Sequence, residues 1–163
     1  MSIEIGQTLP DVTLYRMGEG GPVSESFESL FKGQKVAIFG LPGAFTPTCS
    51  ESHLPGFIVL ADKLKNRGLD RIICLSVNDA FVMSAWGKAQ NAEAIDMLAD
   101  GNADFVRALG LDLDLTSRGM GVRARRFALI ANDGKVSWVK VEAPGQFEVS
   151  SAEAVLDALE QGA

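Results

Sequence analysis

The segment LPGAFTPTCSESHLPGF, residues 41–57, places Cys49 at the end of a loop rich in proline, glycine and threonine. Apolar residues at helical spacing follow, so we expect Cys49 in the first turn of a helix. The nucleophile is the thiolate rather than the thiol, and an unperturbed cysteine is only a few per cent ionised at neutral pH. Free backbone N–H groups and the positive end of the helix dipole favour an anion there. The sequence therefore indicates an activated nucleophile at Cys49.

Polar side chains near Cys49 fit this chemistry. The hydroxyls of Thr46 and Thr48 are able to donate a hydrogen bond to a sulfur or to a substrate oxygen. His53 is the only histidine of the chain, and its spacing of four residues places it on the same helical face as Cys49. Such a histidine acts either as a base or, more often, as a hydrogen-bonded group that supports the site. We favour the supporting role.

An arginine cluster lies far along the chain, in the segment GVRARRFALI. Strand alternation places Arg126 on the face opposite Arg123 and Arg125, beside small apolar residues. An arginine in such surroundings is costly unless it meets an anion, and the thiolate of Cys49 is one candidate. Arg123 and Arg125 are expected on a solvated strand face.

The second cysteine has different neighbours. Cys74 lies in the apolar run RIICLSV, which favours an inert position in the core. A disulfide between Cys49 and Cys74 has no C-x-x-C spacing to support it. Two cysteines and one histidine also do not supply the four ligands of a usual zinc site. For Cys49 itself, the alternative is a small buried hydrophobic residue, but its polar neighbours favour catalysis.

The composition narrows the class of protein. The chain has 163 residues, 47% of them hydrophobic, which fits one globular domain over residues 1–163. A net charge of −6 argues against nucleic-acid binding and against docking to an anionic membrane. No apolar run approaches the roughly 20 residues that span a bilayer, and no signal peptide is recognisable. The two cysteines do not have the spacing of a disulfide framework in a secreted protein, so we expect a cytoplasmic protein.

Hydrophobic periodicity predicts the elements that position these residues. Short apolar or alternating runs predict strands at 12–15, 35–40, 71–77 and 94–100, and a hairpin over 125–142 with Asp133-Gly134 in its turn. Helical spacing predicts helices at 24–33, 48–66, 78–90, 103–110 and 149–161. We expect Pro55 to kink the second helix, and Ser150 to cap the last one in a capping box with Glu153. This order predicts an α/β fold, with helices on both faces of a central sheet.

At this point the chain resembles a known family. The stretch PGAFTPTCS carries the P-x-x-x-T-x-x-C signature of peroxiredoxins, and HLPGF, CLSVNDAFV, WGKAQ and RRFAL resemble the type-5 subfamily, including the plant type II enzymes. The resemblance covers about Ile5 to Leu159. It implies a thioredoxin-like fold with a central mixed sheet. It also implies reduction of hydrogen peroxide and organic hydroperoxides, without a metal or bound organic cofactor.

The resemblance also assigns roles to single residues. Cys49 would be the peroxidatic cysteine and would become a sulfenic acid. Thr46 would hydrogen-bond the peroxide, and Pro42 would shape and shield the pocket. Arg126 would stabilise the thiolate and the negative charge that develops on the leaving oxygen.

The resemblance leaves the reducing partner open. Some type-5 members have a resolving cysteine before the terminal helix, but here that stretch reads FEVSSAEAVL and has no thiol. Either Cys74 resolves the sulfenic acid after local unfolding, or an outside thiol does. The VSSAE variant resembles members linked to glutathione and glutaredoxin, so we favour a one-cysteine mechanism with that donor over thioredoxin.

The resemblance further implies a homodimer, since such members commonly pair through loops near the active site. Phe45 and Phe81 are candidate contacts, although packing in the core would explain either one equally well. Two rival functions are a thiol–disulfide oxidoreductase, which normally needs two nearby thiols, and a binding module in which Cys49 is incidental.

Overall fold

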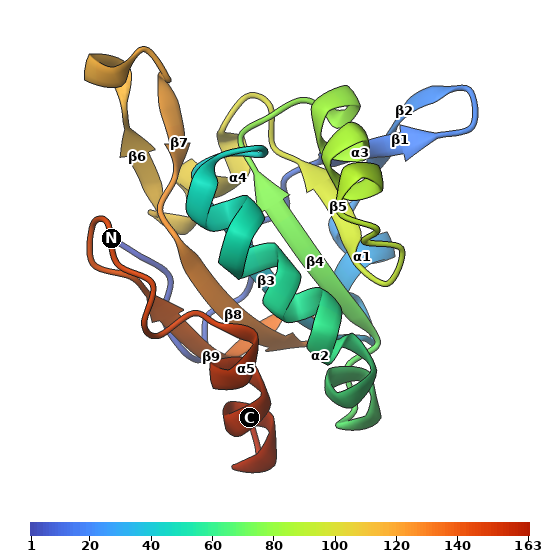
Figure 1. Ribbon diagram of the computed structural model, residues 1–163. Coiled ribbons are helices and arrows are strands. Elements are labelled where there is room, and N and C mark those ends of the chain that lie inside the picture. Colours follow the sequence, from blue (N-terminus) through green and yellow to red (C-terminus); the bar gives the residue numbers. More distant parts are fainter.

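The computed structural model describes residues 1–163 and contains a seven-stranded mixed sheet with the order β2-β1-β5-β4-β3-β8-β9 (Figure 1). Its strands are β1 (Leu14–Gly18), β2 (Gly21–Glu25), β3 (Lys35–Gly40), β4 (Arg71–Ser76), β5 (Asp96–Ala99), β8 (Phe127–Asn132) and β9 (Lys135–Val141). Strands β3, β4 and β5 run parallel, and β8 lies antiparallel to β3. Strands β6 (Asp112–Asp114) and β7 (Val122–Ala124) form a separate small sheet. The predicted mixed sheet is confirmed.

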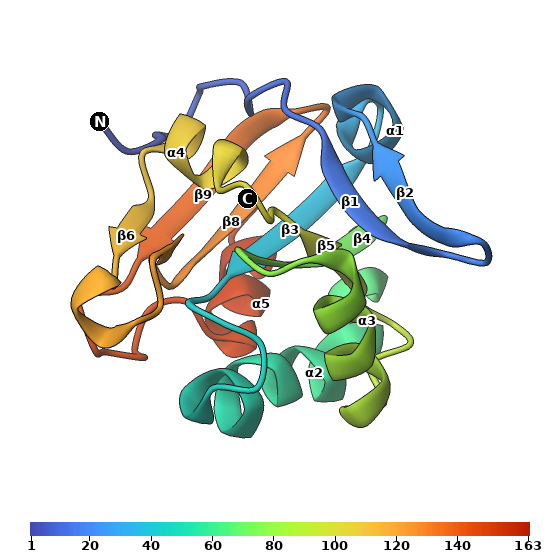
Figure 2. The ribbon, with the colours of Figure 1, turned by 90° about the horizontal axis from the view of Figure 1, so that it is seen from above.

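Helices cover both faces of the large sheet, as predicted (Figure 2). One face carries α2 (Leu54–Asn66), α3 (Ala80–Ala89) and α5 (Ala152–Glu160), and the other carries α1 (Phe27–Phe31) and α4 (Asp104–Leu109). Strand β3 shows how both faces of the large sheet are buried. Its residues Ala37 and Phe39 join the core under α2, α3 and α5, whereas Val36 and Ile38 join the core under α1 and α4.

Side-chain caps mark the starts of α1, α3 and α5. The side chains of Ser26 and Asp79 cap α1 and α3. The prediction for the last helix was wrong by one residue. Ser151 caps α5 by accepting from the Ala154 N–H, while the hydroxyl of Ser150 donates to the Glu142 carboxylate.

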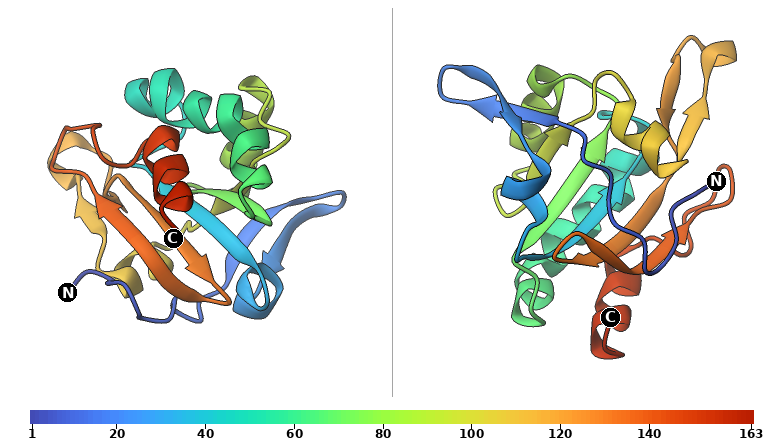
Figure 3. Two further views of the ribbon diagram at one scale, coloured as in Figure 1. Left: turned by 90° about the horizontal axis from the view of Figure 1, so that it is seen from below. Right: turned by 180° about the vertical axis from the view of Figure 1, so that it is seen from behind.

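The hairpin of β8 and β9 forms as predicted. Asp133 and Gly134 both have positive φ angles, 50° and 79°, as a tight type I′ turn requires. The hairpin of β1 and β2 was not predicted: the strand expected at 12–15 begins at Leu14 and continues to Gly18. The chain before it crosses the face that carries α1 and α4, where Ile3 and Leu9 are buried (Figure 3).

The helices of the structure differ in length or hydropathy from a membrane-spanning helix. None of them combines the length and the hydropathy that a membrane crossing needs.

Candidate active site

Cys49 begins a π-helical turn, Cys49–His53, which leads directly into α2. In this turn the Leu54 N–H donates to the Cys49 carbonyl, five residues back. The sequence predicted a continuous α-helix kinked at Pro55. An α-helical Pro55 would press its ring against the carbonyl of Glu51, and the wider turn is the conformation that relieves this clash. Pro55 therefore sits in the first turn of α2 rather than at a kink inside the helix.

The start of this helical segment leaves two backbone donors free. The N–H groups of Thr48 and Cys49 have no hydrogen-bond acceptor. They supply the partial positive charge that the sequence led us to expect beside the cysteine.

The Cys49 side chain has no exposed surface, yet it contacts a cation. Arg126 Nη2 donates to Cys49 Sγ at 3.2 Å. The guanidinium is only partly buried, so the sulfur is enclosed by protein without being sealed in hydrocarbon. A hydrogen bond from a guanidinium is able to stabilise negative charge at the sulfur and beside it.

Arg126 lies between β7 and β8 rather than inside one continuous strand. The alternation used to place it is interrupted there, because Ala124 joins one core and Ala128 joins the other. Arg126 still reaches the predicted anion. Its other terminal nitrogen, Nη1, donates to His53 Nδ1 at 2.9 Å, and its Cζ lies 5.9 Å from the centre of the Phe147 ring.

His53 is buried and bonded on both ring nitrogens. Its Nε2 lies 2.9 Å from the Ser150 carbonyl, which accepts only, so Nε2 carries the proton and Nδ1 accepts from Arg126. Burial, followed by the positive charge of Arg126, lowers the pKa of His53 to about 3. The geometry is that of a neutral supporting histidine rather than a base that touches Cys49.

Thr46 and Pro42 lie on the loop between β3 and the π-helical turn. The hydroxyl of Thr46 donates to the Gly43 carbonyl at 2.6 Å, which leaves its oxygen free to accept a hydrogen bond. The Ala44 N–H donates to Asn78 Oδ1 at 3.0 Å, which ties the same loop to the end of β4.

Arg123 also holds this loop, which contradicts the prediction of a solvated side chain. Its guanidinium donates to the carbonyls of Met120, Val77 and Pro42 at 2.8, 3.1 and 3.4 Å. The sequence shows three arginines at and directly after β7, but it does not show that the small β6–β7 sheet turns Arg123 toward the loop.

Sequence reasoning missed a second support of the π-helical turn. The buried Trp86 of α3 donates from its indole Nε1 to Ser50 Oγ at 3.0 Å. The signal in the sequence was the tryptophan itself. A buried indole N–H needs a hydrogen-bond acceptor, so burial of Trp86 predicts a contact with a polar group.

Cys74 is a core residue, as predicted. It lies in β4, paired with Phe39 of β3 and Met97 of β5, and has no exposed surface. Burial, with a smaller contribution from nearby Cys49, raises the pKa of Cys74 well above its usual range. Both cysteines are free thiols, and no cluster of three potential metal ligands is present.

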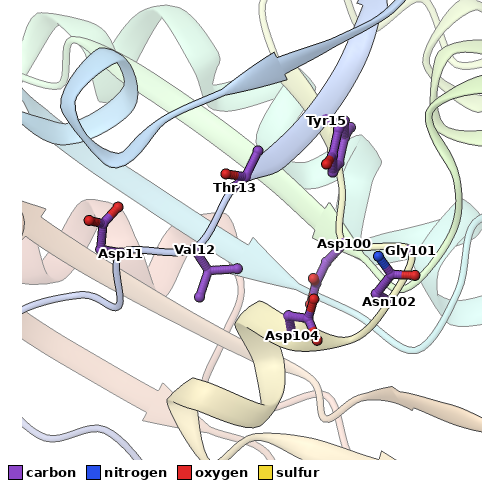
Figure 4. Close-up of a pocket in the computed structure, with 8 residues that line it drawn as sticks. All are labelled: Asp11, Val12, Thr13, Tyr15, Asp100, Gly101, Asn102 and Asp104. Atoms are coloured by element: carbon purple, nitrogen blue, oxygen red, sulfur yellow. The ribbon is translucent and has the colours of Figure 1, made fainter.

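A pocket of about 370 Å³ lies elsewhere, between the start of β1 and the loop after β5 (Figure 4). It is polar and acidic, and Cys49, Thr46 and Arg126 do not line it. Both oxygens of its Asp100 carboxylate already accept backbone N–H groups of α4, from Phe105 and Val106. The Asp100 carboxylate thus has a structural role at the start of α4.

Comparison with known proteins agrees with this geometry. The Redoxin family model matches residues 4–156. Peroxiredoxin-2D and peroxiredoxin-2B of Arabidopsis thaliana are each 50% identical over 159 residues, which cover 96% of this chain and 98% of theirs.

Solved structures give the same result. Reduced Prx3 from Vibrio vulnificus, in complex with H2O2, has a TM-score of 0.93 at 57% identity over 96% of this chain and 99% of its own. Peroxiredoxin 5 from Alvinella pompejana has a TM-score of 0.87 at 36% identity over 98% and 99%. The fold is therefore thioredoxin-like, and the chain belongs to the peroxiredoxins, in the type II or type-5 subfamily, and is a thiol peroxidase.

Proposed function

We propose that Cys49 is the peroxidatic cysteine and that it reduces hydrogen peroxide and alkyl hydroperoxides. The observation that carries the proposal is the 3.2 Å contact between Arg126 Nη2 and Cys49 Sγ. The thiolate attacks one peroxide oxygen, the S–O bond forms as the O–O bond breaks, and the leaving oxygen departs as hydroxide or alkoxide and takes a proton. Cys49 is left as a sulfenic acid.

The neighbouring residues have separate roles in this step. Arg126 stabilises the thiolate and the charge on the leaving oxygen. Thr46 accepts a hydrogen bond from the peroxide O–H, because its own proton is engaged by Gly43. Pro42 shapes the wall of the pocket. The H2O2 complex of Vibrio vulnificus Prx3 supports peroxide as the substrate.

Access to the sulfur requires a small movement. Cys49 has no surface that a water-sized molecule reaches, and hydrogen peroxide is at least that large. A side chain that covers the sulfur therefore moves before the peroxide binds.

An outside thiol then reduces the sulfenic acid, in a one-cysteine mechanism. Cys74 is the only other cysteine, and it is fully buried in the middle of the sheet with a raised pKa. We propose glutathione with glutaredoxin as the donor. No metal or organic cofactor takes part.

A single assay tests the donor. Purified protein is mixed with peroxide and either glutathione plus glutaredoxin or thioredoxin plus its reductase, and peroxide loss is followed. Rapid turnover with the first pair, retained in Cys74→Ala, is the expected result. Turnover with thioredoxin alone, lost in Cys74→Ala, would contradict both the donor and the one-cysteine mechanism.

We also propose a single domain over residues 1–163, a cytoplasmic location and a homodimer. The aromatic side chains of Phe45 and Phe81 are 57% and 61% exposed, which is unusual for large apolar groups and supports a contact surface. Light scattering is expected to give the mass of two chains, and Phe81→Ser to shift it toward one chain. A mass of one chain for the unaltered protein would reject the dimer.

A further inference from the structure

Glu142, directly after β9, is a buried carboxylate that the peroxidase reaction does not use. Only 3% of it is exposed, and no cation pairs with it. Its carboxylate accepts the backbone N–H groups of Glu148, Val149 and Ser150 at 2.8–2.9 Å and the Ser150 hydroxyl at 2.7 Å. Glu142 thereby closes residues 143–150 into a loop whose end is fixed just before α5.

The hydrogen bonds also keep this carboxylate charged. Burial by itself raises the pKa of Glu142, but the three amides and the hydroxyl outweigh burial, and the pKa falls below its usual value. A charged acceptor binds backbone N–H groups more strongly than a neutral one.

The closed loop reaches the catalytic arginine along two paths. Phe147 lies against both Arg126 and His53, with its ring centre 5.9 Å from Arg126 Cζ and 5.0 Å from the His53 ring. The carbonyl of Ser150 accepts from His53 Nε2 at 2.9 Å. The backbone of Glu142 itself joins the same unit, since its N–H donates to the Arg126 carbonyl at 2.9 Å.

The tautomer of His53 is the link between loop and sulfur. With the proton held on Nε2 by the Ser150 carbonyl, Nδ1 offers a lone pair to Arg126 Nη1. The planar guanidinium, fixed at Nη1, then presents Nη2 to Cys49 Sγ. If the proton moved to Nδ1, the Nδ1–H of His53 would face the N–H of Arg126 Nη1. Two donors do not form a hydrogen bond, so Arg126 would lose its contact with His53.

We propose that Glu142 is a positioning residue, which clamps the 143–150 loop so that Ser150 fixes the tautomer of His53 and His53 fixes Arg126 against the Cys49 sulfur. Only the expected change in peroxide rate rests on the proposed function. The tautomer of His53 is measurable without any turnover.

The experiment compares Glu142→Gln with a matched control on the same loop. Glutamine keeps the shape but removes the charge, and its NH2 group does not accept from a backbone N–H as the second carboxylate oxygen does. Glu148→Gln is the control, because the Glu148 side chain is exposed and only its backbone contacts Glu142. Since the chain has a single histidine, imidazole ¹⁵N NMR reports His53 without ambiguity.

The expected result has two parts. Wild type and Glu148→Gln show one neutral tautomer with the proton on Nε2, and Glu142→Gln shows a mixture of states. Glu142→Gln also reacts with hydrogen peroxide about tenfold more slowly, the scale of one lost positioning hydrogen bond. Its alkylation by iodoacetamide, which needs the thiolate but has no O–O bond to polarise, slows less than its reaction with peroxide.

The contrary results are equally defined. A folded Glu142→Gln with the wild-type tautomer and peroxide rate overturns the proposal. If Glu142→Gln does not fold, Ser150→Ala replaces it, because this variant removes only the hydroxyl bond and keeps the Ser150 carbonyl. A mixed tautomer and a roughly threefold slower peroxide reaction then support the clamp, and unchanged values overturn it. Failure of the wild type to reduce peroxide would reject the proposed function and leave the tautomer test intact.

Discussion

The two cysteines of this chain are equally buried and chemically unlike. Cys49 and Cys74 both have no exposed surface, and they lie close enough for the charge of one to raise the pKa of the other. Cys49 sits on a π-helical turn and accepts from a guanidinium. Cys74 sits in the central strand β4, with parallel strands on both sides.

The difference shows that burial alone does not decide the reactivity of a cysteine. What differs is the polar contact and the conformation of the backbone around it. A helical turn at the end of a loop is able to shift and admit a peroxide, whereas a central strand is bonded to both neighbours along its length.

Substitution of Cys49 is expected to abolish activity, whereas substitution of Cys74 is expected to affect only stability. Cys49→Ser loses peroxidase activity down to the uncatalysed background, because an alcohol is not ionised at neutral pH. Cys74→Ala keeps its rate within about twofold and loses about 1–2 kcal/mol of unfolding free energy, since it only empties part of the core. Peroxide consumption and urea denaturation measure the two effects, and activity in Cys49→Ser would erase the distinction.

Removal of the guanidinium is expected to make Cys49 behave more like Cys74. Arg126→Ala slows the reaction with hydrogen peroxide by about a hundred- to a thousandfold, the scale of losing a donor to a developing oxyanion. Arg126→Lys recovers little of this, because one ammonium group does not span His53 and Cys49 together. Stopped-flow measurement of peroxide reduction provides the rates. A wild-type rate in Arg126→Ala would remove the physical basis of the contrast.

Acid is expected to destabilise the Cys49 side of the molecule through His53. The pKa of His53 is about 3 in the folded protein and about 6.5 when unfolded, so below pH 6.5 the unfolded chain binds a proton that the folded chain does not. Stability therefore falls with pH, by about 2 kcal/mol between pH 7.5 and pH 5. The pKa of Glu142 is lower in the folded protein than its usual value, so protonation of this carboxylate lowers the stability further only below about pH 4.5.

Urea denaturation at several pH values measures this slope, and His53→Gln is the control. Glutamine does not titrate, so the variant is expected to lose about 2 kcal/mol less over the same range. Equal slopes in both proteins would mean that His53 is not held neutral.

The smallest expected effect concerns the support of the π-helical turn by Trp86. Trp86→Phe keeps most of the apolar contact but removes the donor to Ser50 Oγ, which costs about 1–2 kcal/mol and slows peroxide reduction a few-fold. Trp138→Phe, at the chain's other tryptophan, on β9 away from this turn, is the matched control. If both variants keep the wild-type peroxide rate, the indole does not hold the turn in its reactive form.

Much of the fold was predictable because it depends on local patterns. The buried strands β3 and β4 are continuous apolar runs, and Asp133-Gly134 requires positive φ angles that few other pairs adopt. The β1–β2 hairpin was missed because its strands are largely exposed and carry no clear alternation.

The active site was predictable in its parts but not in its connections. The sequence placed Cys49, Arg126 and His53 in one site, and in the structure Arg126 contacts both Cys49 and His53 directly. It did not reveal that Arg123 holds the Pro42 loop, because that depends on how a separate small sheet is oriented. The choice of Ser151 over Ser150 as a cap likewise depends on Glu142, a distant carboxylate that occupies the Ser150 hydroxyl.

Trapping of the oxidised sulfur tests the central claim most directly. The reduced protein is treated with one equivalent of hydrogen peroxide in the presence of dimedone, which captures sulfenic acids, and its peptides are analysed by mass spectrometry. The account predicts an adduct on Cys49 and none on Cys74, with the Cys49 adduct strongly reduced in Arg126→Ala. An adduct on Cys74 in place of Cys49, or an unmodified Cys49 after the peroxide is consumed, would contradict it.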